Sequence, residues 1–156
     1  MEIKFSCTVD EHTKGKSRAG VGDKFQKWAD NLVPYQFDSS YTDSDKQTFV
    51  KATQQIEEVT CIRFKEQKAS QYLLVSRTGS CGANYISSYV DKLGANSPTR
   101  MVTEGACMDP SNQLFIGHLA HELMHALGFH HTQKRPDRDD FITVMPNFLN
   151  NYQYTS

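Results

Sequence analysis

The sequence of 156 residues predicts a single mixed α+β domain. Three observations support this fold class: an alternating apolar stretch over residues 32–37, two segments with apolar residues at helical spacing, and several short extended runs between those segments. This length is typical of a single domain and is large enough to bury a substantial core.

The first strand and the first helix are predicted from residues 32–59. Residues 32–37 alternate around Val33, Tyr35 and Phe37, and Pro34 suggests an edge or irregular position for this strand. The segment from Ser44 to Gln47 has the pattern of a capping box. Apolar residues then recur at helical spacing, which predicts a helix over residues 45–59. The residues on this face are Phe49, Ala52, Ile56 and Val59.

Further short elements follow this helix. We expect strands at residues 62–64, 72–76 and 85–90, a turn at 79–82, and a short extended run at 100–103. A second helix is predicted over residues 114–127, where apolar residues step by four and are most simply core. These residues are Phe115, Leu119, Leu123 and Leu127.

The second helix carries the pattern H-E-x-x-H-x-x-G-x-x-H, which specifies a metal site. His121 and His125 are four positions apart, so their imidazoles project from one helical face and can bind one ion. Gly128 can take the left-handed conformation that ends a helix, and the chain can then bring His131 to the same ion. Three imidazoles leave a tetrahedral Zn²⁺ one open position for water, which is typical of a catalytic site.

Glu122 lies beside the first ligand and is the candidate general base, facing the metal-activated water. The alternative is an ordinary amphipathic helix with scattered histidines. If each of the five fixed positions matches by chance roughly one time in twenty, coincidence requires a few million windows. The sequence therefore favours zinc-assisted hydrolysis of a peptide bond.

The flanking motifs resemble those of the astacin family within the metzincin clan. The similarity runs from about residue 19 to residue 150 and includes the segments 33–35, 60–64, 121–129 and 135–139. The resemblance implies a zincin-like fold in which a twisted mixed sheet packs against two long helices, the second of which carries the zinc motif. It also implies a secreted zinc metalloendopeptidase with one Zn²⁺ per chain and a protein or peptide substrate.

The resemblance also gives an expectation for the four cysteines. Cys81 and Cys107 match a disulfide of the family, which would stabilise the fold by roughly 3 kcal/mol. Cys61 lies where the family has a cysteine that pairs with one near the C-terminus, and this chain has no such partner. Cys7 is the only remaining candidate partner, but nothing in the family pattern supports that pairing, so free thiols are the default expectation at Cys7 and Cys61.

The domain organisation is expected to comprise a polar N-terminal segment, residues 1–18, and a peptidase domain, residues 19–156. By the resemblance, the latter would hold the N-terminal subdomain and a truncated C-terminal part. The basic cluster of Lys14, Lys16 and Arg18 fits either processing of a pro-segment or a solvated polar tail. The first residues lack the apolar stretch of a signal peptide, so the export signal of a secreted protein would lie outside this chain.

Residues 100–106 occupy the place of the family's sheet-edge strand above the zinc helix. An exposed edge can pair with an extended substrate through backbone hydrogen bonds. The alternative is an ordinary edge strand that serves only the fold.

Two departures from the family pattern argue against full activity. Thr132 replaces the glutamate that normally follows the third ligand. The chain also ends twenty-five residues after His131 (156 − 131), whereas the family continues into a subdomain that carries the Met-turn and a metal-binding tyrosine. Met145 precedes Pro146 and comes too soon for that turn, and Tyr152 and Tyr154 are too early for the tyrosine. The alternatives to a peptidase are thus an inactive zinc-binding module that captures peptides, and a truncated fragment.

The remaining polar residues are expected to have ordinary structural roles. We expect His118 at an ordinary helix position, His130 in an exposed or packing role, and His12 in solvent. Arg138 and Asp139 are expected to belong to a structural ion-pair network. The formal charge of −1 gives no reason to expect nucleic acid or an anionic membrane as a partner, and no apolar run reaches membrane-spanning length. We expect a monomer.

Overall fold

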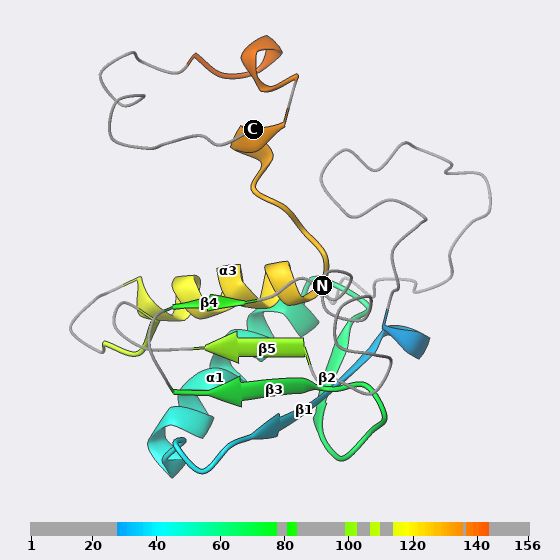
Figure 1. Ribbon diagram of the computed structural model, residues 1–156, viewed down its shortest axis with the longest axis vertical. Helices are drawn as coiled ribbons and strands as arrows, with labels where there is room; N and C mark the ends of the chain where they lie inside the picture. Colours follow the sequence, from blue (N-terminus) through cyan, green and yellow to red (C-terminus); the bar gives the residue numbers. More distant parts are fainter. Residues whose placement is uncertain are drawn as a thin grey trace, which may run out of the picture.

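A computed structural model describes residues 28–77, 81–83, 99–102, 107–109, 114–135 and 137–143. Figure 1 labels the α-helices and the strands. The order of the elements along the chain is η1 (Ala29–Asn31), β1 (Leu32–Phe37), α1 (Asp43–Glu57), β2 (Arg63–Glu66), β3 (Leu73–Ser76), β4 (Gly82–Ala83), β5 (Thr99–Val102), α3 (Phe115–Ala126), η3 (Thr132–Lys134) and η4 (Arg138–Asp140). The expected strand at 85–90, Met145, Tyr152, Tyr154 and the N-terminal segment lie outside the described residues.

The strands form a mixed five-stranded sheet in the order β2-β1-β3-β5-β4. β1 pairs in parallel with β2 and β3, β3 pairs in parallel with β5, and only the β4–β5 pair is antiparallel. The mixed α+β fold class is confirmed. The expectation that residues 100–106 form the sheet edge is wrong for residues 100–102, the part of that segment that the structure describes, because β5 lies between β3 and β4. Among the described strands, β4 forms that edge.

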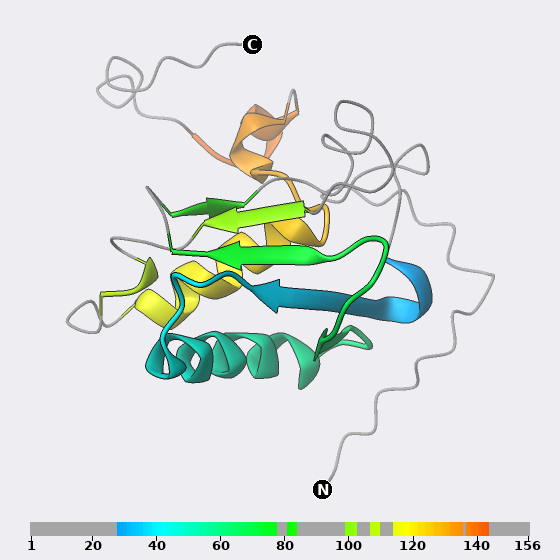
Figure 2. The ribbon, with the colours of Figure 1, turned by 60° about the horizontal axis from the view of Figure 1, so that its bottom comes forward.

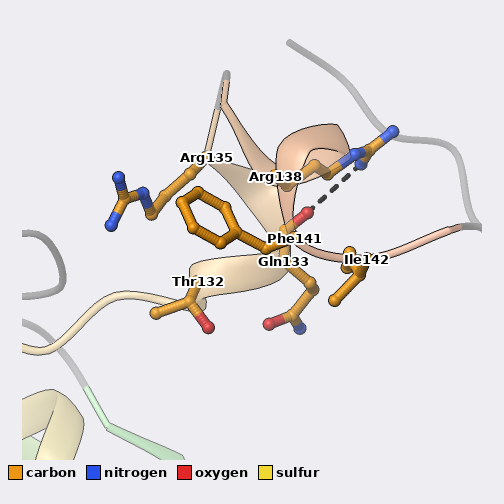
Figure 3. Close-up of a pocket in the computed structure, with 6 residues that line it drawn as sticks. All are labelled: Thr132, Gln133, Arg135, Arg138, Phe141 and Ile142. Carbon is orange, nitrogen blue, oxygen red and sulfur yellow. Dashed lines mark hydrogen bonds between the residues drawn. The ribbon is translucent and has the colours of Figure 1, made fainter.

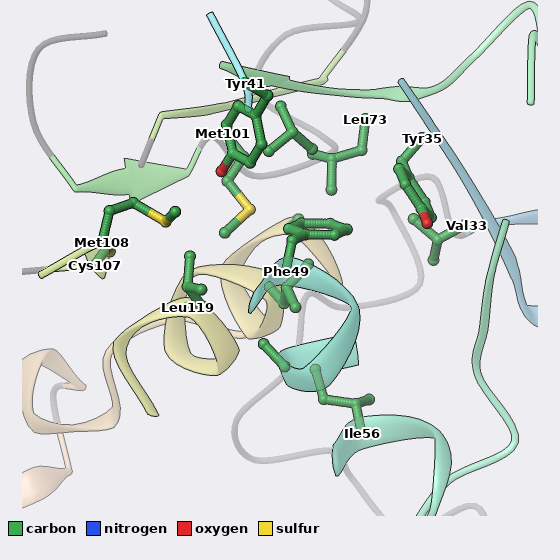
Figure 4. Packing of buried hydrophobic residues seen from close by; sticks show 14 of the residues in the cluster. Val33, Tyr35, Tyr41, Phe49, Ile56, Leu73, Met101, Cys107, Met108 and Leu119 are labelled. Carbon is green, nitrogen blue, oxygen red and sulfur yellow. The ribbon is translucent and has the colours of Figure 1, made fainter. Parts of the chain in front are cut away.

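Both long helices cover one face of the sheet (Figures 1 and 2). The core lies between these layers, and its sheet side is built from alternate residues such as Val33, Leu73, Val75 and Met101. The helices supply Phe49, Ala52, Ile56, Leu119, Leu123 and Ala126 to the same cluster (Figure 4). Burial of these side chains drives the docking of the zinc-motif helix onto the sheet.

Pro34 is tolerated inside β1 because the two neighbouring strands, β2 and β3, pair with different parts of β1. β1 is not an edge strand, but β2 pairs with residues 32–35 and β3 pairs only with residues 35–37. Pro34 thus faces β2 alone among the described strands, and its missing N–H breaks no bond to β3.

The first helix begins two residues earlier than expected. Its capping box is formed by Thr42 and Asp45, not by Ser44 and Gln47: the Thr42 hydroxyl accepts from the Asp45 backbone N–H, and the Asp45 carboxylate accepts from the Thr42 N–H. The helix also ends earlier, at Glu57. Val59 therefore lies beyond the helix and is 63% exposed, which contradicts its expected place on the apolar face of that helix.

The second helix and strands β2, β3 and β5 differ from expectation by one or two residues at their ends. Strand β4 was not expected, because Gly82 was assigned to a turn. Leu119 and Leu123 are fully buried as expected, and Leu127 packs partly buried against the core. No helix in the described part of the chain combines the length and apolar character needed to span a bilayer.

Candidate functional site

The carboxyl-terminal half of α3 is held firmly at the point where the metal motif lies. Leu119, Leu123 and Ala126 anchor its inner face in the core. The indole Nε1–H of Trp28 donates to the Ala126 carbonyl oxygen at 3.0 Å, across 98 residues of sequence. This bond satisfies one of the carbonyls left open at a helix end. The sequence pattern gives no indication of this contact.

The chain leaves α3 through a Schellman motif centred on Gly128. The Gly128 N–H donates to the carbonyl of His125 at 2.9 Å, and the Phe129 N–H donates to the carbonyl of Met124 at 3.0 Å. Gly128 has φ of 99°, a left-handed conformation that a side chain would oppose. The expected role of this glycine is confirmed, and the turn directs residues 129–131 back along the helix.

Three imidazole rings converge as a result of this turn. The Nε2 of His131 lies 3.0 Å from Nε2 of His121 and 2.8 Å from Nε2 of His125. His125 is buried, His131 is half-buried and His121 is exposed, so the group lies at the protein surface with one side protected. The three side chains form a group able to hold a metal ion.

The hydrogen bonding of His125 indicates which ring nitrogen is available to a metal. Its Nδ1 lies 2.7 Å from the carbonyl oxygen of Phe129. A carbonyl only accepts, so the proton is assigned to Nδ1 and the Nε2 lone pair faces the other two rings. A contact of this kind fixes the orientation of a metal-binding histidine.

The donor set fits Zn²⁺. Zinc takes imidazole nitrogens at about 2.0–2.1 Å, and tetrahedral geometry then separates those nitrogens by about 3.3 Å. The observed Nε2 separations of 2.8 and 3.0 Å are a few tenths of an ångström below that value. Small ring movements would therefore accommodate the ion.

Glu122 faces a different environment from the adjacent His121. It is only 9% exposed, and its Oε1 lies 3.8 Å from Sγ of Cys81. Cys81 and Cys107 form a disulfide with a Cα–Cα distance of 5.7 Å, as the resemblance implied. Two cysteine sulfurs and the Glu122 carboxylate therefore cluster beside the helix that carries the imidazoles. The pairing was expected from the sequence, but its contact with Glu122 was not.

Cys61 differs from expectation. It is disulfide-bonded in the structure, so the prediction of a free thiol at this position is wrong. The expectation failed because it rested on the family's partner near the C-terminus. Cys7 lies outside the described residues.

A separate pocket of about 340 Å³ is formed by η3, η4 and the residues after them (Figure 3). Its lining residues are Thr132, Gln133, Arg135, Arg138, Phe141 and Ile142. The expected pairing of Arg138 with Asp139 is present, with Nε and Oδ1 3.2 Å apart, and Arg135 pairs with Asp137. His130 is exposed, which is one of the two roles expected for it. The three ligand candidates do not line this pocket.

Comparison with known proteins links the chain to one family. The family model named astacin, which describes a family of peptidases, matches residues 20–156. Zinc metalloproteinase nas-12 of Caenorhabditis elegans is 33% identical over 91% of this chain and 34% of its own length. Embryonic protein UVS.2 of Xenopus laevis is 31% identical over 97% of this chain and 29% of its own length.

A solved structure supports the fold. The chain is similar to high choriolytic enzyme 1, a hatching enzyme zinc-protease from Oryzias latipes, with a TM-score of 0.60 and 22% identity. The match covers 85% of this chain and 64% of that enzyme. The chain thus spans about a third of the length of the first curated relatives it matches and about two thirds of this structural neighbour.

Proposed function

Because the chain belongs to the astacin family of zinc peptidases, we propose that it is a metalloendopeptidase that hydrolyses peptide bonds in proteins. The observation that carries the proposal is the convergence of three Nε2 atoms, at 2.8 and 3.0 Å, with a buried glutamate, Glu122, next in sequence to His121. The alternative of an ordinary amphipathic helix gives no reason for three imidazoles to meet.

We assign His121, His125 and His131 as ligands of one zinc ion and Glu122 as the general base. When bound there, zinc would lower the pKa of a water to about 7 and would polarise the carbonyl of the peptide bond. Glu122 accepts the proton of the attacking water on its carboxylate and then delivers it to the leaving amine. The Phe129 carbonyl holds the His125 ring in the orientation that directs its Nε2 toward His131.

The substrate is a protein or peptide, and β4 is its proposed docking strand. β4 pairs with β5 on one side and is the sheet edge among the described strands, and it packs against α3. An extended peptide can add to such an edge through main-chain hydrogen bonds, which place few demands on its sequence. This role replaces the one expected for residues 100–106.

The remaining proposals concern the whole protein. We propose that it is secreted, which the disulfide bonds at Cys61, Cys81 and Cys107 support because disulfides persist in oxidising compartments. Residues 19–156 form the peptidase domain and residues 1–18 a polar tail or the remnant of a pro-segment. The protein acts as a monomer, without nucleic acid or membrane as a partner.

One experiment tests the peptidase assignment. Zinc content and cleavage of a mixed peptide library are measured for the unmodified chain, for Glu122→Ala, and for Glu58→Ala as a control at an exposed position. We expect one zinc per chain in all three and loss of cleavage only in Glu122→Ala, by about 10²–10⁴-fold. Zinc with no cleavage in any of them would favour a peptide-capture module or a fragment instead.

A further inference from the structure

The disulfide between Cys81 and Cys107 lies directly against the proposed general base. Sγ of Cys81 is 3.8 Å from Oε1 of Glu122, Cys107 is fully buried, and Glu122 is nearly so. The bond connects the residue just before β4 with the turn that precedes α3. It therefore cross-links the residue before the sheet edge to the segment between β5 and α3, and its contact with Glu122 reaches the helix that carries the metal motif.

The oxidation state of these cysteines decides what Glu122 can bond to. A disulfide sulfur has no proton, so in the oxidised protein Cys81 can only pack against the carboxylate and restrict its rotamers. In the reduced protein the Cys81 thiol could donate its S–H to Oε1 at this separation, and two free side chains would replace one rigid cross-link. The Glu122 side chain, with three rotatable bonds, would then lose the fixed packing surface that restricts its rotamers and gain a bond to a mobile thiol.

We propose that the Cys81–Cys107 disulfide is a positioning element for Glu122, so that its reduction suppresses turnover while the three histidines still hold zinc. This inference rests on the proposed peptidase function. Reduction by a phosphine transfers two electrons to the disulfide: the S–S bond breaks, water supplies two protons to the thiols, and its oxygen leaves as phosphine oxide. The reverse step needs an oxidised thiol reagent such as glutathione disulfide.

The first test uses a Cys7→Ser/Cys61→Ser variant, in which the only cysteines left are Cys81 and Cys107. We expect the phosphine to lower kcat by at least about tenfold, since an oriented general base is worth about 10²–10⁴ in rate. KM should change less than about twofold, zinc should stay at one per chain, and glutathione disulfide should restore kcat. Unchanged kcat with two free thiols counted would overturn the proposal, and so would loss of zinc or of folded structure in parallel with kcat.

A second test does not need activity. In the reduced protein, the negative carboxylate of Glu122 should disfavour the Cys81 thiolate and slow its alkylation by iodoacetamide. Glu122→Gln should therefore speed alkylation of Cys81 several-fold, whereas Glu58→Gln, which changes an exposed charge elsewhere, should not. Equal rates in all three would overturn the proposed contact. If the alkylation rates of Cys81 differ as expected but neither the oxidised nor the reduced protein cleaves peptides, the proposed peptidase function is wrong and the contact between Cys81 and Glu122 is still supported.

Discussion

At the scale of single residues, backbone carbonyls and one indole determine how well the imidazoles converge. Phe129 occupies a position of the metal motif at which any residue is allowed. Its backbone carbonyl nevertheless accepts the hydrogen bond from Nδ1 of His125. Trp28, far away in sequence, donates to Ala126 at the end of the same helix. The spacing of the histidines predicts the ligands, but main-chain partners of this kind leave no trace in residue identity.

Removal of the indole donor should weaken both the fold and the metal site. Trp28→Phe keeps an aromatic ring in the core and leaves the Ala126 carbonyl without its partner. We expect the free energy of unfolding to fall by about 1–3 kcal/mol, the cost of a buried unsatisfied group. Urea denaturation of the zinc-free protein measures this loss, and an unchanged midpoint would show that the bond contributes nothing.

Metal binding should depend unequally on neighbouring histidines. His131→Ala removes a proposed ligand, and we expect the zinc affinity to fall by at least about tenfold. Loss of a residue that only orients a ligand already weakens metal binding by about that factor, so loss of the ligand itself should weaken it at least as much. His130→Ala, at the adjacent exposed position, is the matched control and should bind zinc like the unmodified chain. Competition with a chelating dye gives both affinities, and equal weakening in the two variants would contradict the ligand assignment.

At the scale of elements, both ends of α1 are built from residues whose roles the sequence only partly revealed. The Thr60 hydroxyl donates to the Ile56 carbonyl, and Nη1 of Arg63 donates to the carbonyls of Glu57, Thr60 and Ile62. The segment 60–64, noted for its resemblance, is therefore a helix-capping device that leads into β2. The sequence pattern located this segment but could not assign its task.

The start of α1 is tied to the end of β3 through Asp45. Its carboxylate caps the helix and also accepts hydrogen bonds from Nη1 of Arg77, which lies 3.1 Å from both carboxylate oxygens.

Replacement of this carboxylate should destabilise the fold. Asp45→Asn removes the charge that pairs with Arg77 and weakens the cap. We expect a loss of about 1–2 kcal/mol in the free energy of unfolding at neutral pH, measured by urea titration. Asp43→Asn, at an almost fully exposed side chain, should change it by less than about 0.5 kcal/mol.

The same residue predicts an acid dependence of stability. Desolvation by burial raises the pKa of Asp45, but the hydrogen bonds from Thr42 and the bond and charge of Arg77 together outweigh it and lower the pKa below its ordinary value of 3.8. A depressed pKa in the folded state gives stability that is fully present above the unfolded value. That stability is lost as the pH falls through the folded value.

Unfolding curves recorded between neutral pH and about pH 3 test this dependence. The unmodified chain should lose stability on acidification more steeply than Asp45→Asn, so the difference between the two should shrink. A constant difference across this range would show that Asp45 is not ionised in the folded protein or does not interact with Arg77.

At the scale of the whole molecule, the helices and the first strand were predictable because their apolar periodicities are long or regular. Strand order was not predictable. Parallel pairing through long connections leaves no local signal, so β5 was mistaken for the edge that β4 provides. The convergence of the histidines followed from the motif, whereas the position of the disulfide against Glu122 depends on how the sheet edge meets α3.

The core between the sheet and the two helices should dominate stability. Leu119 is fully buried in it, and Leu119→Ala should cost about 2–5 kcal/mol through lost burial and a cavity. Leu114→Ala, at a side chain that is 67% exposed just before α3, is the matched control and should cost under about 0.5 kcal/mol. Chemical denaturation distinguishes them, and equal small losses would mean that α3 is not docked on the sheet as described.

The most direct test of the metal site is X-ray absorption spectroscopy of the zinc-loaded protein. We predict nitrogen ligands at about 2.0–2.1 Å with multiple-scattering features of three imidazoles, and the loss of one imidazole in His131→Ala. Sulfur ligation at about 2.3 Å, or two imidazoles in the unmodified chain, would contradict the assignment of His121, His125 and His131 as a single zinc site.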